Sequence, residues 1–431
     1  MERSRLFGIY AVRFVTAAVT LAVGVSGCNG SAGTAGPPAG VTPAAVLDSG
    51  SSSGTPIQHI VLVVQEARTF NNLWGTVKVG KARVGHHVVT VRLKKVDLES
   101  KRSLRSDYLA YLKAYDNGKM DGFAYGPNEP AAYEYVNPAQ IRPYFAIAAD
   151  YGSADHMFQT QGSGDFTAHQ DLIRGGTEIS SSTSIIDDPD ASPPWGCPGR
   201  PGTQTSLITT SRKYLFKAGP FPCFTYDTLQ TRLDPKSISW KYYAPTLQQF
   251  GSGAVWNAFL AIQAVADNKT EWDEHISSPE TNVLRDIAHG NLPAMSWVIP
   301  SGDNSDHAGF ARDRGPSWVA KIVNAIGESQ YWNSTAIVIV WDDWGGFYDP
   351  VPPTLDDQGG AGFRVPMLAV SAYTPQAYVS HTVYGFGSII RFIEDTFGLK
   401  RLGTTDKTST SIGDMFDFNQ SPRPFEKIPS E

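Results

Sequence analysis

The chain has 431 residues and a formal net charge of −6, and 41% of its residues are hydrophobic against 18% that are charged. This composition is typical of a well-packed globular protein with one large domain or two ordinary ones. An acidic chain lacks the basic footprint that nucleic-acid binding requires, so we exclude nucleic acid as a partner.

The first 27 residues have the pattern of a bacterial signal peptide. Three arginines lie within the first 13 residues, and residues 14–24 form an apolar run too short to span a bilayer. The run ends in VSGC at 25–28, which resembles a lipobox and implies a lipid on Cys28. A plain signal peptide with an incidental cysteine is the alternative. With the lipid, the exported protein would sit on a membrane, facing the periplasm or the cell surface.

The segment that follows has the composition of a flexible linker. Residues 29–54 are mainly Gly, Ser, Ala, Thr and Pro, which cannot offset the entropy cost of folding. We therefore expect a signal peptide at 1–27, a linker at 28–55 and one folded domain at 56–431.

Two cysteines lie inside the expected domain, in loop-like surroundings rich in proline. They are Cys197 and Cys223. Export would place them in an oxidising compartment, so we expect them to form a disulfide that closes a long insertion. In the chain-entropy model a loop of this size contributes about 3 kcal/mol to stability.

Strand patterns alternate with helical patterns through the domain. Residues 57–64 and 336–340 are nearly unbroken β-branched runs, which are typical of strands buried on both faces of a parallel sheet. Shorter strand patterns lie at 296–299 and 365–371, and helical patterns lie at 317–329 and 387–396. The alternation predicts an α/β domain with a central, mostly parallel sheet and helices on both faces. The pattern shows no second core, and the polar tail after Leu402 predicts a loose end.

Three acidic residues follow the two main strand patterns. Glu66 comes after the first, and Asp342 and Asp343 come after the second. In open α/β sheets ligands bind beyond the carboxyl ends of the strands, so we expect these three side chains in one region. They predict either a site for a hard divalent cation, which prefers oxygen ligands, or caps of the turns that follow the strands.

Several longer motifs, in order, resemble the bacterial phosphoesterase family of phospholipases C and acid phosphatases. Residues 57–70 (IQHIVLVVQEARTF) are similar to its opening motif, and residues 341–349 (WDDWGGFYD) to its late motif. Shorter matches are ADHMF at 154–158, GSG at 162–164, AHQ at 168–170, NSDH at 304–307, GPSW at 315–318 and GFRVP at 362–366. The resemblance covers almost the whole expected domain.

The resemblance implies an alkaline-phosphatase-like fold and hydrolysis of phosphoric esters, a substrate class that includes phospholipids, with a divalent metal ion. Glu66, Asp342 and Asp343 match metal ligands of the family. Asp165 aligns with the nucleophile position, which is a Ser or Thr in the family. His307 matches a histidine of the active-site region, where it would bind phosphate or protonate the leaving group.

The chain departs from the family pattern inside the motifs that carry chemistry. Ala67 replaces an Asn ligand, Asp165 replaces the hydroxyl nucleophile, and Asn71, Pro350 and Gly385 replace Asp, His and Glu. Asp165 is therefore predicted either to attack phosphorus itself or to serve as a metal ligand in place of the missing Asn. The alternative function is a catalytically impaired lipoprotein with a binding role.

For the remaining candidate residues, a purely structural role is the alternative to a role in the site. Ser163 and Thr167 are near the nucleophile position but out of register with it. The ring of His169 is expected to bond to the backbone or to act in the site. His156 lies at a position that resembles one of the family, with a buried structural role as the equal alternative, and His381 is interpreted in the same way. Trp341 and Trp344 are expected in the core rather than around a cationic head group.

Overall fold

The computed structural model describes residues 54–99, 103–125, 132–247, 253–309, 312, 314–354 and 361–430. Cys28, the predicted signal peptide and the linker as far as residue 53 lie outside the described residues. Within the described ranges, no helix combines the length and the apolar character needed to cross a membrane.

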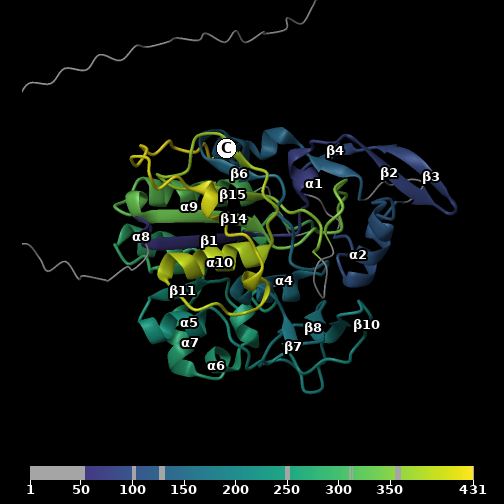
Figure 1. Ribbon diagram of the computed structural model, residues 1–431, viewed down its shortest axis with the longest axis horizontal. Helices are drawn as coiled ribbons and strands as arrows, with labels where there is room; N and C mark the ends of the chain where they lie inside the picture. The colour runs from purple at the N-terminus through teal and green to yellow at the C-terminus, as the bar shows by residue number, and fades with distance from the viewer. Residues whose placement is uncertain are drawn as a thin grey trace, which may run out of the picture. The chain divides into compact units, whose positions relative to one another are not determined.

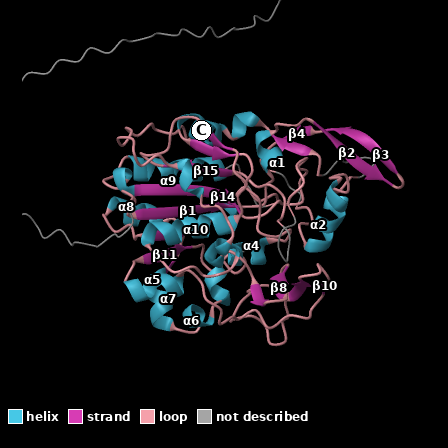
Figure 2. Cartoon of the chain, viewed as in Figure 1, coloured by secondary structure: helices cyan, strands magenta, loops and turns pink. Residues whose placement is uncertain are grey.

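An eight-stranded sheet forms the centre of the domain (Figures 1 and 2). Five of its seven neighbouring strand pairs are parallel, and only β15 runs against its two neighbours. The predicted mostly parallel sheet is therefore confirmed. In sheet order the strands are β12 (Ile276–Ser277), β11 (Trp240–Tyr243), β13 (Met295–Val298), β1 (His59–Gln65), β14 (Thr335–Trp341), β15 (Met367–Val370), β6 (Gly152–Ala154) and β16 (Tyr378–Ser380).

Helices cover both faces of this sheet, as predicted. Neighbouring residues of a strand point to opposite faces. On one face, Tyr243 of β11 donates its hydroxyl to Asp286 of α8. On the other face, the ring of the preceding residue, Tyr242, packs on Phe259. Trp297, which pairs with Tyr242, donates to a carbonyl of α4. The helices are α1 (Phe70–Trp74), α2 (Tyr108–Tyr115), α3 (Arg142–Asp150), α4 (Asp165–Arg174), α5 (Gln230–Leu233), α6 (Gln263–Ala266), α7 (Lys269–His275), α8 (Asn282–Ala288), α9 (Gly315–Gly327) and α10 (Phe386–Phe397).

The elements with the clearest sequence patterns fold as predicted. β1 and β14 lie in the middle of the sheet, and each is buried almost throughout because it has neighbours on both edges and helices on both faces. α9 and α10 correspond to the two helical patterns. The apolar face of α10 is buried, and it includes Ile389, Ile390, Phe392 and Ile393.

An excursion between β1 and β6 builds a second, smaller hydrophobic cluster, which the sequence pattern did not reveal. It contains β2 (Val79–Val84), β3 (His87–Arg92), β4 (Lys94–Val96), β5 (Glu134–Val136) and α2. Its rings pack on the segment after β14, where Phe123 lies 6.0 Å from Trp344 and 5.1 Å from Tyr348 between ring centroids. The excursion is thereby held against the late motif.

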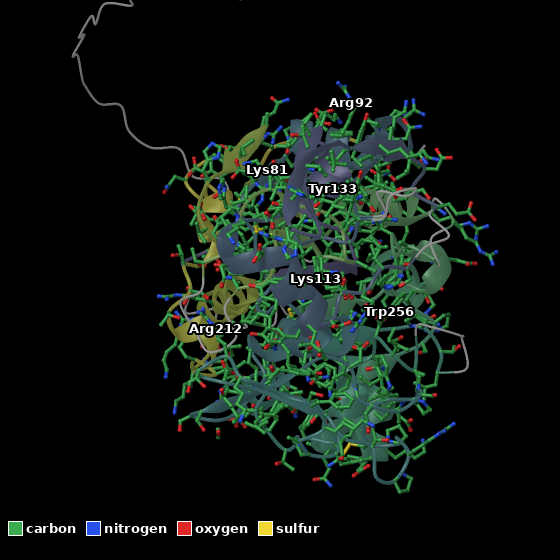
Figure 3. The ribbon with its side chains drawn as sticks, turned by 90° about the vertical axis from the view of Figure 1, so that its right-hand side faces the viewer. Lys81, Arg92, Lys113, Tyr133, Arg212 and Trp256 are labelled. Carbon is green, nitrogen blue, oxygen red and sulfur yellow. A yellow bond between two sulfur atoms is a disulfide. The ribbon has the colours of Figure 1, made fainter. Side chains whose placement is uncertain are left out.

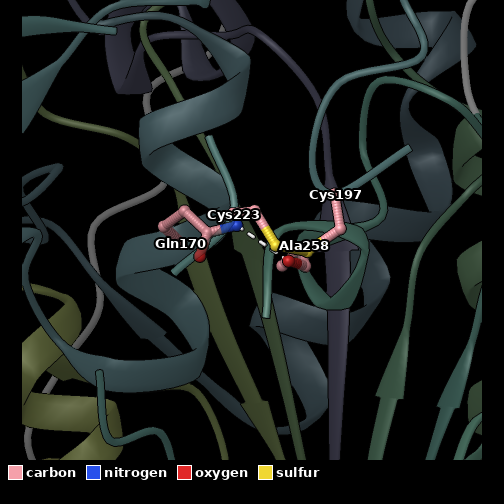
Figure 4. Close-up of a disulfide and its surroundings, with 4 residues drawn as sticks. All are labelled: Gln170, Cys197, Cys223 and Ala258. Atoms are coloured by element: carbon pink, nitrogen blue, oxygen red, sulfur yellow. Dashed lines mark hydrogen bonds between the residues drawn. A yellow bond between two sulfur atoms is a disulfide. The ribbon is translucent and has the colours of Figure 1, made fainter. Parts of the chain in front are cut away.

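A second insertion forms a four-stranded antiparallel sheet of β7 (Glu178–Ser180), β8 (Thr183–Ile186), β9 (Ser206–Thr209) and β10 (Tyr214–Leu215). The predicted disulfide between Cys197 and Cys223 closes the loops of this insertion (Figure 4). Beside it, Cys197 donates its backbone N–H to Leu260, and Gln170 of α4 donates to Ala258. The insertion is thus tied to the helix that follows residue 164.

The carboxyl-terminal tail is packed, so the predicted loose end is wrong. Ile412, Met415, Phe416 and Ile428 are buried in the main core, and Trp332 donates to the carbonyl of Arg423 at 2.8 Å. Asn324 of α9 pairs with both the N–H and the carbonyl of Ile428 at 2.8 Å each. These few apolar side chains among polar ones fill hollows between elements that are distant in sequence, which a local pattern does not show.

We expect Ile428→Ala to lower the free energy of unfolding by about 2–4 kcal/mol, because it empties a buried position at the end of the chain. Urea denaturation followed by tryptophan fluorescence measures the change. Val383→Ala is the control, since Val383 is half exposed and its truncation should change stability by less than about 0.5 kcal/mol. Equal midpoints for the two variants would contradict a packed tail.

Candidate functional site

The carboxyl ends of the central strands place the predicted acidic residues together. β1 and β14 pair in parallel with Gln65 opposite Trp341, so Glu66 and Asp342 leave adjacent strands at the same edge. The backbone N–H of Ala67 donates to Asp342 Oδ1 at 2.8 Å and fixes the two turns to each other. The expectation that these carboxylates share one region is therefore met by the geometry.

Helix α4 adds two further side chains to the same place. Asp165 is its first residue, and His169 lies four residues later on the same side of the helix. His169 Nε2 is 3.3 Å from Glu66 Oε1 and 3.6 Å from Asp342 Oδ2. Ligand atoms of Glu66, His169 and Asp342 lie within 4.8 Å of one another, and so do those of Asp165, Asp342 and Asp343. We call these five residues the carboxylate cluster.

In both Asp342 and Asp343, one carboxylate oxygen bonds to the backbone of the turn and the other lies in the cluster. Asp342 Oδ1 accepts from Ala67 and from the N–H of Asp343, and Asp343 Oδ1 accepts from the N–H of Gly345. Their Oδ2 atoms are buried without a hydrogen-bond partner among the described residues, as are Glu66 Oε1 and Asp165 Oδ1. One oxygen of each residue therefore caps the turn, and the other is left for a ligand, so that the metal interpretation stays a prediction.

The cluster concentrates negative charge in the interior. Burial, and then the charge of Asp165, raises the pKa of Glu66 well above its ordinary value. The pKa values of Asp342 and Asp343 are raised in the same way, first by burial and then by Glu66 and Asp342 respectively. Burial lowers the pKa of His169 to about 4, so this ring is neutral at pH 7 and does not offset the charge. A cation in the cluster would relieve this repulsion.

His307 faces the cluster from the loop after β13. Its Nδ1 is 2.6 Å from the carbonyl of Ala308, which only accepts hydrogen bonds, so Nδ1 carries a proton. Its Nε2 lies 4.0 Å from Asp165 Oδ1. The ring of Trp256 packs 6.5 Å from His169 and 5.8 Å from His307 between centroids. Burial lowers the pKa of His307, which favours the neutral ring.

A cleft of about 1010 Å³ opens at Asp165 and His307. One wall comes from the segment leading into α2, with Arg105 and Leu109. The other wall comes from the insertion sheet and includes Asp188 and Phe216. In Figure 1 the hairpin β2–β3, α2 and the insertion sheet lie together on one side of the central sheet. The two additions to the α/β core thus shape the approach to the cluster.

The nearby residues that the sequence analysis ranked lower serve the fold. Ser163 and Thr167 bond to each other, and Ser163 Oγ accepts from the N–H of Asp187. Trp341 donates to Asp306, and Trp344 donates to the carbonyl of Ser106; both rings are buried, so the expected core position is confirmed.

Two of the substituted motif positions also have structural roles. The Asn71 side chain accepts from the N–H of Val77 and donates to its carbonyl, and Gly385 is the N-cap of α10. His169, inside the cluster, and Trp256, beside it, are the site residues that the sequence pattern did not single out. The spacing of four residues between Asp165 and His169 on one predicted helix was the available signal for the histidine.

The family model "Phosphoesterase family" matches residues 57–400. The chain belongs to the phosphoesterase family. This phosphoesterase is 22% identical over 426 residues to the non-hemolytic phospholipase C of Pseudomonas aeruginosa, across 86% of its own chain and 59% of that protein. It is 23% identical over 246 residues to phospholipase C B of Mycobacterium tuberculosis, across 48% of its own chain and 46% of that protein. The chain thus spans about half the length of these relatives.

Among solved structures, a protein in the alkaline phosphatase superfamily from Vibrio parahaemolyticus is similar to this phosphoesterase at 10% identity and a TM-score of 0.36. The similarity covers 84% of this chain and 74% of that one. The α/β fold class follows from the sheet and helices described above.

The residues of the cluster fit a divalent cation. Four buried carboxylate oxygens without a hydrogen-bond partner among the described residues converge with one imidazole, and no Lys or Arg in the described ranges forms an ion pair with these carboxylates. Oxygen donors with one nitrogen suit Mg²⁺, Mn²⁺ or a similar ion. Ala67 offers no ligand atom at the position where the resemblance implies an Asn.

We expect Asp343→Asn to have opposite effects with and without metal. In EDTA the variant should melt at a higher temperature than the parent, because it removes one buried negative charge from the cluster. With Mn²⁺ added it should gain less stability, and its affinity should be at least about tenfold weaker. Calorimetric titration and thermal melting measure both effects. Asp227→Asn, an exposed aspartate outside the cluster, should match the parent, and an unchanged Mn²⁺ affinity in Asp343→Asn would remove Asp343 from the site.

Proposed function

We propose that this phosphoesterase is a metal-dependent hydrolase of phosphoric esters, with the chemistry of phospholipases C and acid phosphatases. The observation that carries the proposal is the buried carboxylate cluster, which opens through Asp165 and His307 into a cleft of about 1010 Å³. The names of its relatives, which are phospholipases C, support the same reaction class.

Glu66, Asp342 and Asp343 would hold the cation, with His169 as a nitrogen ligand. A bound divalent ion polarises phosphoryl oxygens and offsets the charge that develops in the transition state. The protein's own contribution is to bury these ligands away from water and to fix their positions, because two strand ends and one helix hold them. A phosphate ester would enter from the cleft and meet Asp165 and His307 first.

His307 is proposed to act as the general base and the general acid of the reaction. Because Nδ1 donates to the carbonyl of Ala308, Nε2 is the nitrogen that faces Asp165 and the cleft. Where water attacks phosphorus, the neutral ring would accept the proton of that water at Nε2, and the charged ring would give it to the leaving alcohol oxygen. Where Asp165 attacks, the ring would have to be charged beforehand to protonate the leaving oxygen, and would then take a proton from the water that hydrolyses the acyl phosphate.

Asp165 has two possible roles that a single substitution separates. As a nucleophile, its carboxylate attacks phosphorus, the bond to the alcohol oxygen breaks, and water later hydrolyses the acyl phosphate. As a ligand, its oxygen takes the place of the Asn amide that the resemblance implies at position 67. An Asn side chain at position 165 would retain the second role and lose the first, because an amide oxygen coordinates cations but is a poor nucleophile.

The protein is further proposed to act at a membrane surface after export, anchored by a lipid on Cys28. Eleven Lys and Arg residues and four Asp and Glu residues lie within residues 78–119, a net charge of +7 in a chain whose total is −6. Figure 3 shows Lys81, Arg92, Lys113 and Arg212 on one face. The overall charge therefore conceals a basic region, which would suit anionic lipid head groups.

Exposed apolar side chains accompany this charge. Val79, Val84 and Val88 of the β2–β3 hairpin are each about half exposed, and Leu109 and Phe216 line the cleft with 49% and 65% of their surfaces exposed. Basic and apolar side chains together on the β2–β3 hairpin and α2 favour contact with a lipid surface over contact with nucleic acid.

We expect metal-dependent hydrolysis by the parent chain and a loss of at least about 100-fold in Asp165→Ala and in His307→Ala. The assay follows release of p-nitrophenol from p-nitrophenyl phosphate, a monoester, and from p-nitrophenylphosphorylcholine, a diester, with and without added divalent cations. Retained turnover in Asp165→Asn would identify Asp165 as a ligand, and its loss would favour the nucleophile.

Asp227→Asn, which changes an exposed aspartate outside the cluster, is the matched control and should keep the parent's rate. An inactive parent together with an active Asp165→Ser variant would overturn the proposal. That outcome would mean that the fold is retained for binding, which is the alternative function.

Charge reversal of the hairpin tests the membrane proposal independently of turnover. In a Cys28→Ser background and in EDTA, the chain should sediment with phosphatidylcholine vesicles that contain phosphatidylglycerol, and added salt should weaken this binding. Lys81→Glu with Arg92→Glu should weaken it by at least about tenfold.

The matched control reverses Lys321 and Lys400, two exposed lysines in or next to the helices α9 and α10. Equal loss in the control pair would make the effect one of total charge. Binding to a DNA duplex as tight as to the vesicles would instead identify nucleic acid as the partner of the basic face.

A further inference from the structure

Outside the carboxylate cluster, two histidines converge on one carboxylate. His156 Nδ1 lies 2.6 Å from Asp155 Oδ1, and His381 Nδ1 lies 2.7 Å from Asp155 Oδ2. One ligand atom from each of the three residues falls within 4.8 Å of the others. The histidine side chains are 36% and 75% exposed, so the expectation of a buried structural His156 is wrong, and the group is open to solvent.

The backbone holds the three residues in place from two separate parts of the chain. Asp155 follows β6 and His381 follows β16, and these parallel strands pair with Ala154 opposite Ser380. The N–H of Asp155 donates to the carbonyl of Ser380, and the N–H of Tyr384 donates to the carbonyl of His156. The sheet edge therefore fixes the backbone positions from which the three side chains converge.

The charged residues nearby do not neutralise Asp155, so the three residues form a ligand set with one negative charge. Arg364 donates to the backbone carbonyl of Asp155, but its guanidinium makes a two-point ion pair with Asp349 that neutralises it. Asp414, the next carboxylate along the edge, accepts from hydroxyl groups of Ser380, Tyr384 and Thr382. Within the described residues, Asp155 forms ion pairs only with the two histidines.

We propose that Asp155, His156 and His381 bind a transition-metal ion of the zinc class. Two imidazoles and one carboxylate suit Zn²⁺, Co²⁺ or Ni²⁺ rather than Mg²⁺ or Ca²⁺, which prefer oxygen alone. Three protein ligands leave the fourth position of a tetrahedral ion to water. The ion replaces the two shared protons and ties β16, the outermost strand of the sheet, to β6. This site is separate in sequence and chemistry from the carboxylate cluster and does not rest on the proposed hydrolysis.

The number of bound zinc ions tests the proposal. After dialysis against Zn²⁺ at a low free concentration, the parent should retain one ion more than His381→Ala or Asp155→Asn, measured by elemental analysis. With Co²⁺ in place of Zn²⁺, the visible absorption of a four-coordinate ion should fall in both variants. Calorimetric titration should show affinity for this site at least about tenfold weaker in the variants.

His289→Ala is the matched control, because His289 is exposed and bonds only to the carbonyl of Arg285 among the described residues. It should retain the parent's zinc content. Equal zinc content in the parent, His381→Ala and Asp155→Asn would overturn the proposal, and so would an equal loss in His289→Ala. Because the readout is metal content, an enzyme that turns over no ester would leave this result unchanged.

Discussion

The repulsion among Glu66, Asp342, Asp343 and Asp165 is the constraint on which this structure depends. Burial, and then the neighbouring negative charges, raise the pKa values of Glu66, Asp342 and Asp343, and the one histidine inside the cluster is itself too deeply buried to be charged at neutral pH. The folded protein therefore has an unfavourable electrostatic free energy at this cluster, which only protons or a cation relieve. Such a cost persists in a fold when the surrounding structure fixes the groups too firmly for them to move apart.

The central sheet supplies that firmness. β1 and β14 pair over their full lengths, so the turns that follow them leave the sheet at one level. Gly345 lies so close to Ala67 that an added Cβ would sit 2.0 Å from the carbonyl oxygen of Ala67. The two turns are locked by this contact and by the bond from Ala67 to Asp342. α4 then closes the cluster from one side, because its first turn places Asp165 and its second places His169.

A feature could be predicted from the sequence when the residues that form it lie close together in the chain. β1, β14 and α10 have local patterns that their burial alone requires, and the acidic residues at the strand ends follow from strand direction. The disulfide follows from the expected export and from the two cysteines inside the domain. The packed tail around Ile428 and the aromatic cluster around Phe123 depend on surfaces hundreds of residues away in the chain, so no window of sequence contains both partners. His169 needed the helical phase of α4, which starts at Asp165 rather than earlier.

Ala67 shows that the backbone and the side chain of a motif position have separate roles. Its φ of 56° is left-handed, a conformation that costs a residue with a Cβ about 1–2 kcal/mol and that Asn tolerates better than Ala. The resemblance implies Asn at this position, which would offer both the tolerance and a ligand atom, and Ala offers neither. The N–H of Ala67 nevertheless fixes Asp342, so the geometry of the carboxylate cluster does not require an amide at position 67. Asp165 lies in the same cluster, which supports the proposal that its carboxylate takes the place of that ligand.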